Sequence, residues 1–312
     1  MAKHHVIDSS PSTIHWGFFD AALKPITQVK SGDTVTFNCV SGGREAMPPP
    51  PFVVPPELLE IHEKCTQRMP GHLLTGPVAV EGAEPGDTLE IRIKDVRPRA
   101  DWGYTGFRPL AGGLPEDFPY KRLIHIPIDR ARNVARLPWD MELPLDPFFG
   151  VIGVAPPPVY GAISSIVPRE FGGNLDLKEL RAGSTLYLPV FNKGALLSVG
   201  DGHSVQGDGE VSLMALETCM AGTFEIVLRK DLTLKFPRAE TPTHWITLGL
   251  DEDLDQAAKQ ALREMIRLLG ELRNMHPADA YSLCSLAVDL RVTQIVDGNK
   301  GIHAMLPKSL LA

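Results

Sequence analysis

Alternating hydrophobic and polar positions mark three short stretches of the chain, each directly after a glycine-containing turn. The stretches are residues 27–38, 80–93 and 178–190, and each holds a Gly-Asp or Gly-Ser turn followed by apolar residues at every second position. The apolar sets are Val35/Phe37, Leu89/Ile91/Ile93 and Leu186/Leu188. Alternation with a period of two after a glycine turn is typical of a β-strand with one buried face. The unequal spacing of the stretches indicates repeated use of one β unit and not a solenoid.

Helical periodicity is concentrated in the last sixty residues. Apolar residues at three- and four-residue steps predict a helix over about 254–275, and an aspartate just before it would cap its start. A second helix is predicted over roughly 278–288, followed by an alternating strand at 290–296. Asp297 and Gly298 then form a turn signal that ends this strand.

Proline and glycine punctuate the chain often, at 28 residues each of 312. Such a composition favours many short strands and turns over long helices. Six prolines within 47–56 predict an extended surface arm, and residues 98–168 are predicted to form long loops with weak strands near 123–128. We therefore predict a mainly β fold: a β-sandwich or distorted barrel core in residues 1–250, with a smaller α+β part at 251–312 packed on it.

Charge and cysteine usage exclude several classes of protein. The net charge of −7 and the lack of a basic run argue against a nucleic-acid partner. Four scattered cysteines without a C-x-x-C pair fit a reducing compartment. The most apolar stretch, 148–167, is interrupted by three prolines, and the N-terminus lacks the apolar core of a signal peptide. We expect a cytoplasmic protein with no membrane partner.

Residues 200–210 carry the densest chemistry of the chain. The segment holds Asp201, His203, Asp208 and Glu210, with the carboxamide of Gln206 and four glycines among them. Glycine permits close backbone approach and positive φ at a cost in conformational entropy. A Gly-Asp-Gly phrase alone is more often a hairpin turn, but three acids and an imidazole together favour a site.

The spacing within this segment suits a metal. In an extended chain Asp201 and His203 point to one face, as do Asp208 and Glu210, and a turn near 204–207 would bring the two faces together. Imidazole with carboxylate ligation suits zinc or manganese, whereas an all-oxygen set would suit calcium. We therefore expect a divalent metal with Asp201 and His203 among its ligands.

Several motifs together resemble one family, the metal-dependent acetamidases and formamidases. The resemblance is carried by residues 75–87 (TGPVAVEGAEPGD), 173–176 (GNLD), 194–210 and 287–294, and His15 and residues 25–34 also fit. It spans nearly the whole chain, and the combination is more specific than any single motif. The resemblance implies a hydrolase of short linear amides such as formamide and acetamide. It also implies a mostly β protein with a smaller α+β part, a bound zinc, calcium at a second site, and a homo-oligomer.

The chemistry of amide hydrolysis assigns the roles that these residues would take. A divalent metal activates water at neutral pH and polarises the carbonyl. We expect His15 or Glu84 to supply a third metal ligand beside Asp201 and His203. Glu210 is the expected general base and proton shuttle, although Glu84 could exchange roles with it.

Further polar residues complete the predicted site. The carboxamides of Gln206 and Asn174 would hold the substrate amide or the oxyanion. A second set comprises Asp208, Asp176 and His72. Ordinary structural alternatives exist for His15, as a lone histidine near the start of a strand, and for Glu84, as an exposed acid in a turn.

Two alternatives remain open from the residues. In the first, Asp201, Asp208 and Glu210 hold a structural calcium in a non-catalytic β protein, against which His203 argues because imidazole is a poor calcium ligand. In the second, the hydrolase acts on larger or cyclic amides. Other amide-cleaving designs find no support, because the chain lacks His-x-His, His-Glu-x-x-His and Gly-x-Ser-x-Gly motifs.

Overall fold

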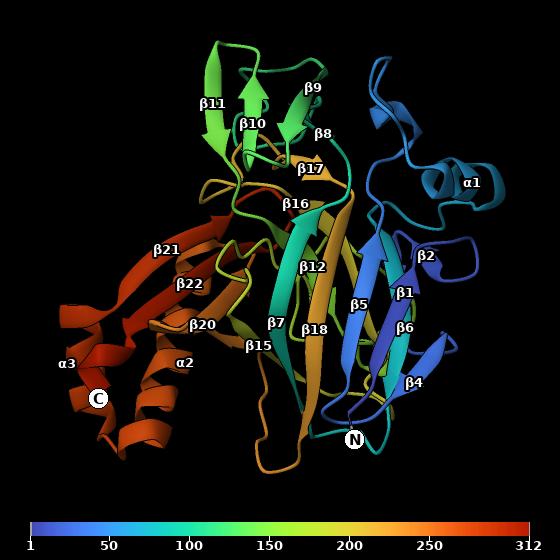
Figure 1. Ribbon diagram of the computed structural model, residues 1–312. Helices are drawn as coiled ribbons and strands as arrows, with labels where there is room; N and C mark the ends of the chain where they lie inside the picture. Colours follow the sequence, from blue (N-terminus) through green and yellow to red (C-terminus); the bar gives the residue numbers. More distant parts are fainter. Residues whose placement is uncertain (1, 312) are drawn as a thin grey trace.

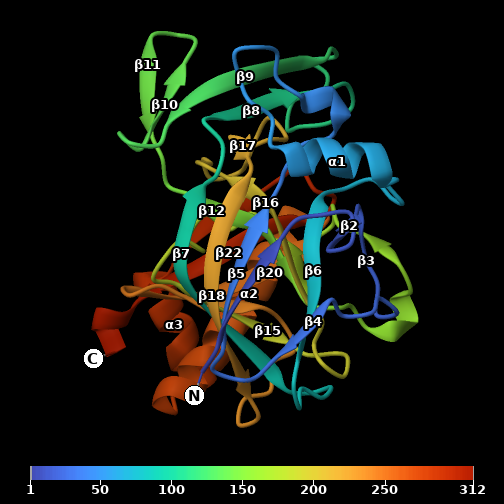
Figure 2. The same cartoon turned by 45° about the vertical axis from the view of Figure 1, so that its right-hand side comes forward.

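Short strands make up most of the regular structure in the computed structural model, which describes residues 2–311 (Figures 1 and 2). They form two large sheets and one small one. The nine-stranded sheet has the order β1 (His4–Asp8), β5 (Thr34–Cys39), β18 (Met220–Arg229), β7 (Thr88–Pro98), β15 (Thr185–Pro189), β19 (Arg238–Glu240), β20 (His244–Asp251), β22 (Lys300–Pro307) and β21 (Asp289–Gln294).

The second sheet has eleven strands. Its main path is β11 (Met141–Pro144), β10 (Val134–Leu137), β9 (Arg122–Asp129), β8 (Trp102–Phe107), β17 (Glu217–Thr218), β16 (Leu197–His203), β12 (Phe148–Gly153) and β14 (Gly172–Asn174). Strand β6 (Leu73–Val80) pairs with β16 and also with β2 (Ile14–Trp16) and β4 (Thr27–Val29). The small sheet pairs β3 (Phe18–Phe19) with β13 (Ile163–Ser164).

The two large sheets pack face to face over a common hydrophobic core. Phe224 on β18 contacts Phe37 on the neighbouring β5 and Phe149 on β12 of the other sheet, with ring centroids 5.9 and 5.7 Å apart. The alternating residues of β5, β7 and β15 are all buried in this core, so the strands predicted from period-two alternation are confirmed. The mainly β fold with two packed sheets is therefore confirmed as well.

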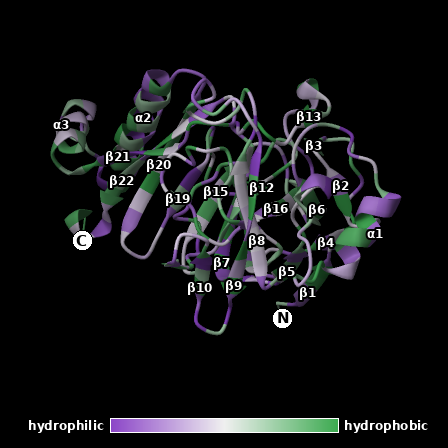
Figure 3. Cartoon of the chain, turned by 90° about the horizontal axis from the view of Figure 1, so that it is seen from above, coloured by the Kyte–Doolittle hydropathy of each residue, from purple (hydrophilic) through white to green (hydrophobic). Residues whose placement is uncertain are grey.

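In the described part of the chain, three α-helices lie outside the sheets: α1 (Pro56–Lys64), α2 (Leu254–Arg273) and α3 (Pro277–Ala287). Short 3₁₀ helices occur at Arg44–Ala46, Pro158–Tyr160 and Lys308–Leu311. The carboxylate of Asp253 caps α2 by accepting hydrogen bonds from the amides of Asp255 and Gln256. Figure 3 shows both hydrophobic and hydrophilic stretches on α2, which packs one side on β20 and β22. The two helices predicted near the C-terminus are confirmed.

The structure differs from the sequence predictions in two segments. Residues 98–168 hold strands β8 to β13 where long loops with weak strands near 123–128 were predicted. Strand β9 confirms the weak strand, whereas β11 is exposed along its length and so shows no alternation. Helix α1 follows the proline-rich arm directly, where no helix was predicted, and it buries Leu58 and Ile61 beside Trp102.

The C-terminal part shares a sheet with the rest of the chain. Strand β20 runs up to Asp251, at the predicted boundary, and pairs along its whole length with β22. The division at 250/251 remains a prediction, since β21 and β22 extend the nine-stranded sheet while α2 and α3 cover that end of it (Figure 1). Within residues 2–311, no helix is both long enough and apolar enough to cross a membrane.

Candidate functional site

Strand β16 positions the first two candidate ligands. It lies inside the second sheet, flanked by β12, β6 and β17, and every one of its residues is buried. The side chains of Asp201 and His203 turn to the same side, with His203 Nε2 3.0 Å from Asp201 Oδ2. The Oε2 atom of Glu217, on the adjacent β17, lies 3.2 Å from the same nitrogen. These three residues form one buried cluster with metal-ligand geometry.

A carboxamide fixes the orientation of the His203 ring. Gln206 Oε1 lies 2.9 Å from His203 Nδ1, while Gln206 Nε2 donates to the backbone oxygen of Asp176 at 2.9 Å. Because the second bond sets the direction of the amide, Oε1 can only accept, so Nδ1 carries the hydrogen. A proton on Nε2 would be donated to the two carboxylates, and without that proton the Nε2 lone pair is free to bind a metal ion held between them.

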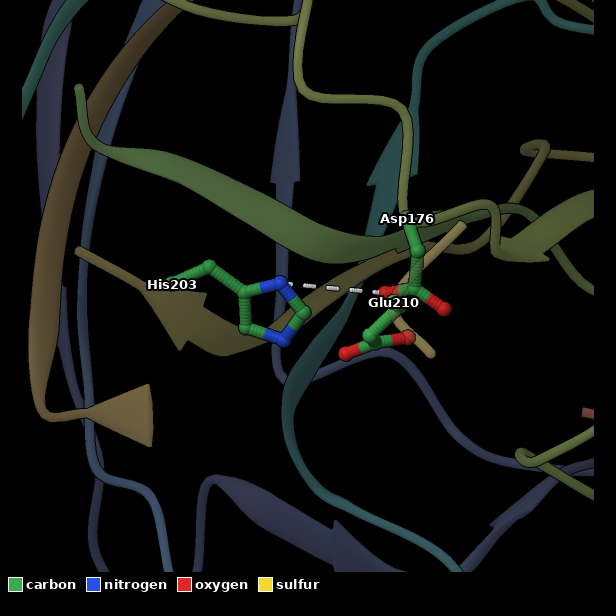
Figure 4. Close-up of side chains that lie close together, drawn as sticks. All are labelled: Asp176, His203 and Glu210. Atoms are coloured by element: carbon green, nitrogen blue, oxygen red, sulfur yellow. Dashed lines mark ion pairs between the residues drawn. The ribbon is translucent and has the colours of Figure 1, made fainter. Parts of the chain in front are cut away.

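A second group of acids lies beside the same ring. Figure 4 shows Asp176 and Glu210 together on one side of His203, and the three form a further cluster with metal-ligand geometry. Asp176 Oδ1 is 3.8 Å from His203 Nδ1. Asp176 lies just after β14, whereas Glu210 lies in the loop between β16 and β17. The cluster is therefore assembled from segments that are far apart in the sequence. Asp297, in the turn before β22, lines the same space.

Gly150 on β12 leaves an open space at the centre of these groups. A Cβ atom at this position would lie 2.5 Å from Asp176 Oδ1, 2.7 Å from Asp201 Oδ2 and 2.7 Å from His203 Cε1. Two carboxylate oxygens and an imidazole ring thus approach the Gly150 backbone more closely than any side chain at this position would allow. Absence of a side chain at Gly150 creates a cradle that an ion would fit.

Unpartnered oxygens support the same interpretation. Among residues 2–311, five buried side-chain oxygens around this space accept no hydrogen bond: Asn174 Oδ1, both oxygens of Asp176, Glu217 Oε2 and Asp297 Oδ2. Buried acceptors without a donor are costly in a folded protein. A bound cation would satisfy them, and the mixture of imidazole and carboxylate suits zinc or manganese.

Burial and mutual repulsion raise the pKa values of four acids around the site. Burial, together with the charge of Asp201, raises the pKa of Glu217 to about 7, although His203 lowers it in part. Burial raises the pKa of Asp297 to about 7. For Asp176 and Glu210, burial is again the main cause, and neighbouring carboxylates add to it, so that both pKa values lie well above the usual range. Each of these shifts favours the uncharged carboxyl over the carboxylate.

The pKa values of Asp201 and His203 shift in the directions expected of an ion pair. Burial would raise the pKa of Asp201, but the charges of His72 and His203 outweigh it and hold the pKa below the usual range. Burial would lower the pKa of His203, but Glu217 and Asp201 outweigh it and hold the pKa well above 6.5. The pair thus keeps both a negative charge and a positive charge inside the protein.

Three of the site acids have backbone conformations that residues other than glycine rarely adopt. The φ angles are 50° at Asp176, 59° at Asp201 and 43° at Glu210, all in the left-handed region. Sparsely populated backbone conformations of this kind cluster at functional sites. Here each one turns a carboxylate toward the shared space.

A cavity of about 730 Å³ opens onto the cluster. Its lining includes five acids, a histidine and a carboxamide of this region: Asp176, Asp201, Glu210, Glu217, Asp297, His72 and Asn174. His72 Nε2 lies 3.7 Å from Asp201 Oδ2, and its amide hydrogen is donated to Ser165 Oγ. A small molecule entering this cavity would therefore reach the carboxylates directly.

The structure does not bring every candidate residue to this cavity. Glu84 is exposed in the turn between β6 and β7 and is not among the lining residues. His15 is buried, and both of its ring nitrogens are hydrogen-bonded, to the Phe18 carbonyl at 2.7 Å and to Ser198 Oγ at 2.9 Å. Burial lowers the pKa of His15 to about 4. Neither residue lies in one of the clusters with metal-ligand geometry.

Asp208 belongs to a separate group with Glu179 and His303. Asp208 is exposed and forms an ion pair with Lys178 at 3.0 Å, whereas Glu179 Oε2 and His303 Nε2 are buried 3.4 Å apart. The candidates from the sequence thus divide into a main site and this neighbouring group.

Sequence reasoning missed Glu217, Asp297 and Gly150. Glu217 stands as a single acid in the apolar run 215–220, and such an acid inside a strand is a signal that it has a buried partner. The sequence indicates that Asp297 is a turn residue, which it is, but Asp297 also lines the cavity. Nothing in the sequence distinguishes Gly150 from other glycines.

Two packed β-sheets with a buried imidazole–carboxylate cluster below an open cavity define a β protein with a candidate metal centre. The chain belongs to the Acetamidase/Formamidase family, whose sequence profile matches residues 21–160 and 159–311.

Similar proteins carry names from the same family. A formamidase from Methylophilus methylotrophus is 33% identical over 255 residues, which cover 61% of this chain and 61% of that protein. An acetamidase from Mycolicibacterium smegmatis is 31% identical over 201 residues, or 46% of this chain and 50% of that protein. The chain thus spans about half to three fifths of the length of these curated relatives.

Solved structures share the fold over nearly the whole chain. An acetamidase from Bacillus halodurans has a TM-score of 0.85 at 32% identity and covers 98% of both chains. A chain described as a predicted acetamidase/formamidase from Thermoanaerobacter tengcongensis has a TM-score of 0.87 at 27% identity, covering 100% of this chain and 98% of that one. A γ-lactamase from Delftia acidovorans, with 23% identity and a TM-score of 0.66, shares the fold alone.

Proposed function

We propose that this protein hydrolyses the C–N bond of small linear carboxamides at the cluster around His203, with a zinc ion as the preferred metal. The observation that carries the proposal is the position of His203 Nε2 between Asp201 and Glu217, beside the space left by Gly150. In the reaction, water adds its oxygen to the carbonyl carbon, the C–N bond breaks, and the products are a carboxylate and ammonia.

The metal would be held by the imidazole of His203 and the carboxylates of Asp201 and Glu217, with Asp176 and Glu210 beside them. When bound, it supplies a polarised carbonyl and a water whose pKa falls to roughly 7. An imidazole at the centre of the donor set favours zinc or manganese over calcium, and thereby favours the hydrolase over a protein with a structural calcium only.

Glu210 is the residue proposed to move protons. Burial raises its pKa, so the carboxyl can hold a proton and release it to the departing nitrogen, which otherwise leaves poorly. Glu84 is left out of the mechanism because its carboxylate is exposed in a turn outside the cavity.

The two carboxamides take different parts in the proposal. Both ends of the Gln206 amide are already engaged, so Gln206 orients His203 and is not assigned to the substrate. Asn174 lines the cavity, and its buried Oδ1 atom has no donor, so we assign it to accept a hydrogen bond from the NH₂ group of the substrate.

The direct test is ammonia release from formamide, acetamide and propionamide, measured before chelation, after chelation, and after zinc or manganese is added back, with the metal content determined by elemental analysis. We expect chelation to abolish the activity and His203→Ala or Glu217→Gln to lower it at least 100-fold. Glu84→Gln is the matched control for Glu210→Gln, because it makes the same change in an exposed turn. Inactivity with metal bound, or unchanged activity in both His203→Ala and Glu210→Gln, would contradict the mechanism.

A homo-oligomer is also proposed, following the family resemblance. The exposed fractions of Tyr281 and Leu286 on α3 are 61% and 84%, and Leu290 on the neighbouring edge strand β21 is 43% exposed. Apolar side chains beside an unpaired sheet edge are typical of an interface between subunits. Light scattering of the purified protein tests this, and a monomer at micromolar concentration would refute it.

A further inference from the structure

The cavity is much larger than the small amides named above require. Acetamide has four non-hydrogen atoms and needs the room of roughly three water molecules, at about 30 Å³ each. The cavity measures about 730 Å³, which is within the usual range for ligands of drug size. Space therefore remains for a longer substrate that extends from the acids at the inner end.

Positive charge gathers on one other part of the cavity lining. Arg108, Lys121 and Arg122 line the cavity from the hairpin of β8 and β9. Phe107 pairs with Arg122 across this hairpin, so Arg108 follows and Lys121 precedes the same pair. Three cations at the end of one hairpin repel one another unless a counterion lies nearby.

The neighbouring arginines show what paired cations look like here. On β9, β10 and the turn between them, Arg130 pairs with Asp101, Arg132 with Glu142, and Arg136 with Asp129. Among residues 2–311, none of the three cations at the cavity has an acid within 4.0 Å. Arg108, Lys121 and Arg122 therefore remain available to bind an anion.

The other charged groups lining the cavity do not neutralise them. The carboxylate of Glu45 lies over Gly43, where a Cβ would be 2.6 Å from it. Lys300 is a further cation of the lining, and it donates to the carbonyl of Glu252 at 2.7 Å. The loop that joins β8 to β9 is held in place, since the Gly113 amide donates to the Val211 carbonyl at 2.8 Å.

Apolar side chains line the same cavity: Leu123, Ile166, Leu213, Met214, Ile295 and Val296. They suit methylene groups between a reacting amide and a charged end.

We infer that the preferred substrates are amides that carry a distal carboxylate on a short alkyl chain, with the amide at the His203 cluster and the carboxylate at Arg108, Lys121 and Arg122. The inference rests on the proposed amide hydrolysis and names its substrate class. Water attacks the amide carbon, the C–N bond breaks, ammonia leaves, and a dicarboxylate is the product. The distal carboxylate does not react and serves only for recognition.

The test compares amides of equal length that differ in the distal group: glutaramate with pentanamide, and adipamate with hexanamide. We expect kcat/KM to be at least ten-fold higher for the anionic member of a pair, mainly through a lower KM, and the preference to weaken in 0.5 M NaCl because of screening. In the triple variant Arg108→Ala/Lys121→Ala/Arg122→Ala the anionic-to-neutral ratio should fall toward one. The matched control Arg130→Ala/Arg132→Ala/Arg136→Ala removes three charges from the same hairpin region and should keep the wild-type ratio.

A binding measurement separates this inference from the proposed reaction. Calorimetry on the zinc-loaded protein compares glutarate with valerate, which lacks the second carboxylate, and wild type should bind glutarate about ten-fold more tightly. If no amide is hydrolysed but this difference exists and is lost in the triple variant, the reaction is wrong and the anion site stands. Equal kcat/KM within each amide pair together with equal binding of glutarate and valerate would overturn the inference, even with acetamide hydrolysed normally.

Discussion

Replacing Gly150 by alanine would place one methyl group among the side chains that we propose to hold the metal. The new Cβ would lie 2.5 Å from Asp176 Oδ1 and 2.7 Å from both Asp201 Oδ2 and His203 Cε1. Normal contacts of carbon are about 3.5–4.0 Å, so each neighbour must retreat by roughly an ångström. The backbone itself is no obstacle, because Gly150 is not among the residues with positive φ.

Two effects follow from this displacement. Overpacking of a buried site lowers the free energy of unfolding by about 1–3 kcal/mol. Zinc–oxygen bonds of about 2.0–2.2 Å leave no room for both the methyl group and the ion. We therefore expect zinc affinity to fall at least 100-fold, which corresponds to about 2.7 kcal/mol.

The assay is a zinc competition titration against a chromophoric chelator, with urea unfolding of the metal-free protein in parallel. Gly207→Ala is the matched control, because a Cβ there meets nothing within 4 Å although the residue lies in the loop after His203. Wild-type zinc affinity in Gly150→Ala would show that the ion does not sit in this space, and the reasoning from the cradle would then be wrong.

Three further predictions concern the support of the site and the fold. Gln206→Ala frees the His203 ring and should lower zinc affinity about 10–100-fold in the same competition titration, whereas unchanged affinity would mean that the amide does not orient the ligand. His15 has a pKa of about 4 in the folded protein and about 6.5 when unfolded, so the unfolded chain binds more protons between these values. Stability should therefore fall by roughly 3 kcal/mol as pH drops from above 6.5 to below 4; His15→Gln should remove that part of the slope in urea titrations, and an identical slope in the variant would refute it. Asp253→Ala removes the cap of α2 and should lower the free energy of unfolding by about 1 kcal/mol, measured by urea unfolding; no change would mean that water replaces the cap.

The parts of the fold that could be predicted are those where a local pattern matches a local structure. The alternation of Leu89, Ile91 and Ile93 predicts a strand because one face of β7 is buried in the core. Helix α2 is long enough to show a clear period of apolar residues, and its cap, Asp253, directly precedes it in the sequence. Helix α1 has only nine residues and follows several prolines. The segment is therefore too short for a helical period of apolar residues to be recognised in the sequence. Strand β11 has no buried face and therefore no alternation.

The site likewise contains residues that local sequence patterns predict and residues that they do not. Asp201 and His203 are two residues apart on one strand, and the face that they share follows from strand geometry. Glu217 and Asp297 reach them only through the pairing of β17 with β16 and the return of the chain before β22, which are non-local features. His15 and Glu84 fit the motifs, yet hydrogen bonding occupies the first and exposure removes the second from the cavity. Residue types indicate the chemistry of a site, but long-range topology selects its members.

The left-handed backbone at Asp176, Asp201 and Glu210 sets the site against the stability of the fold. Each such residue costs about 1–2 kcal/mol relative to an ordinary conformation, and glycine or asparagine would bear the same φ more easily. A library of variants selected for heat resistance alone should therefore accumulate glycine or asparagine at these three positions and lose metal binding as it does so. Retention of all three carboxylates in any descendant of this chain would then be evidence that its metal site is still in use.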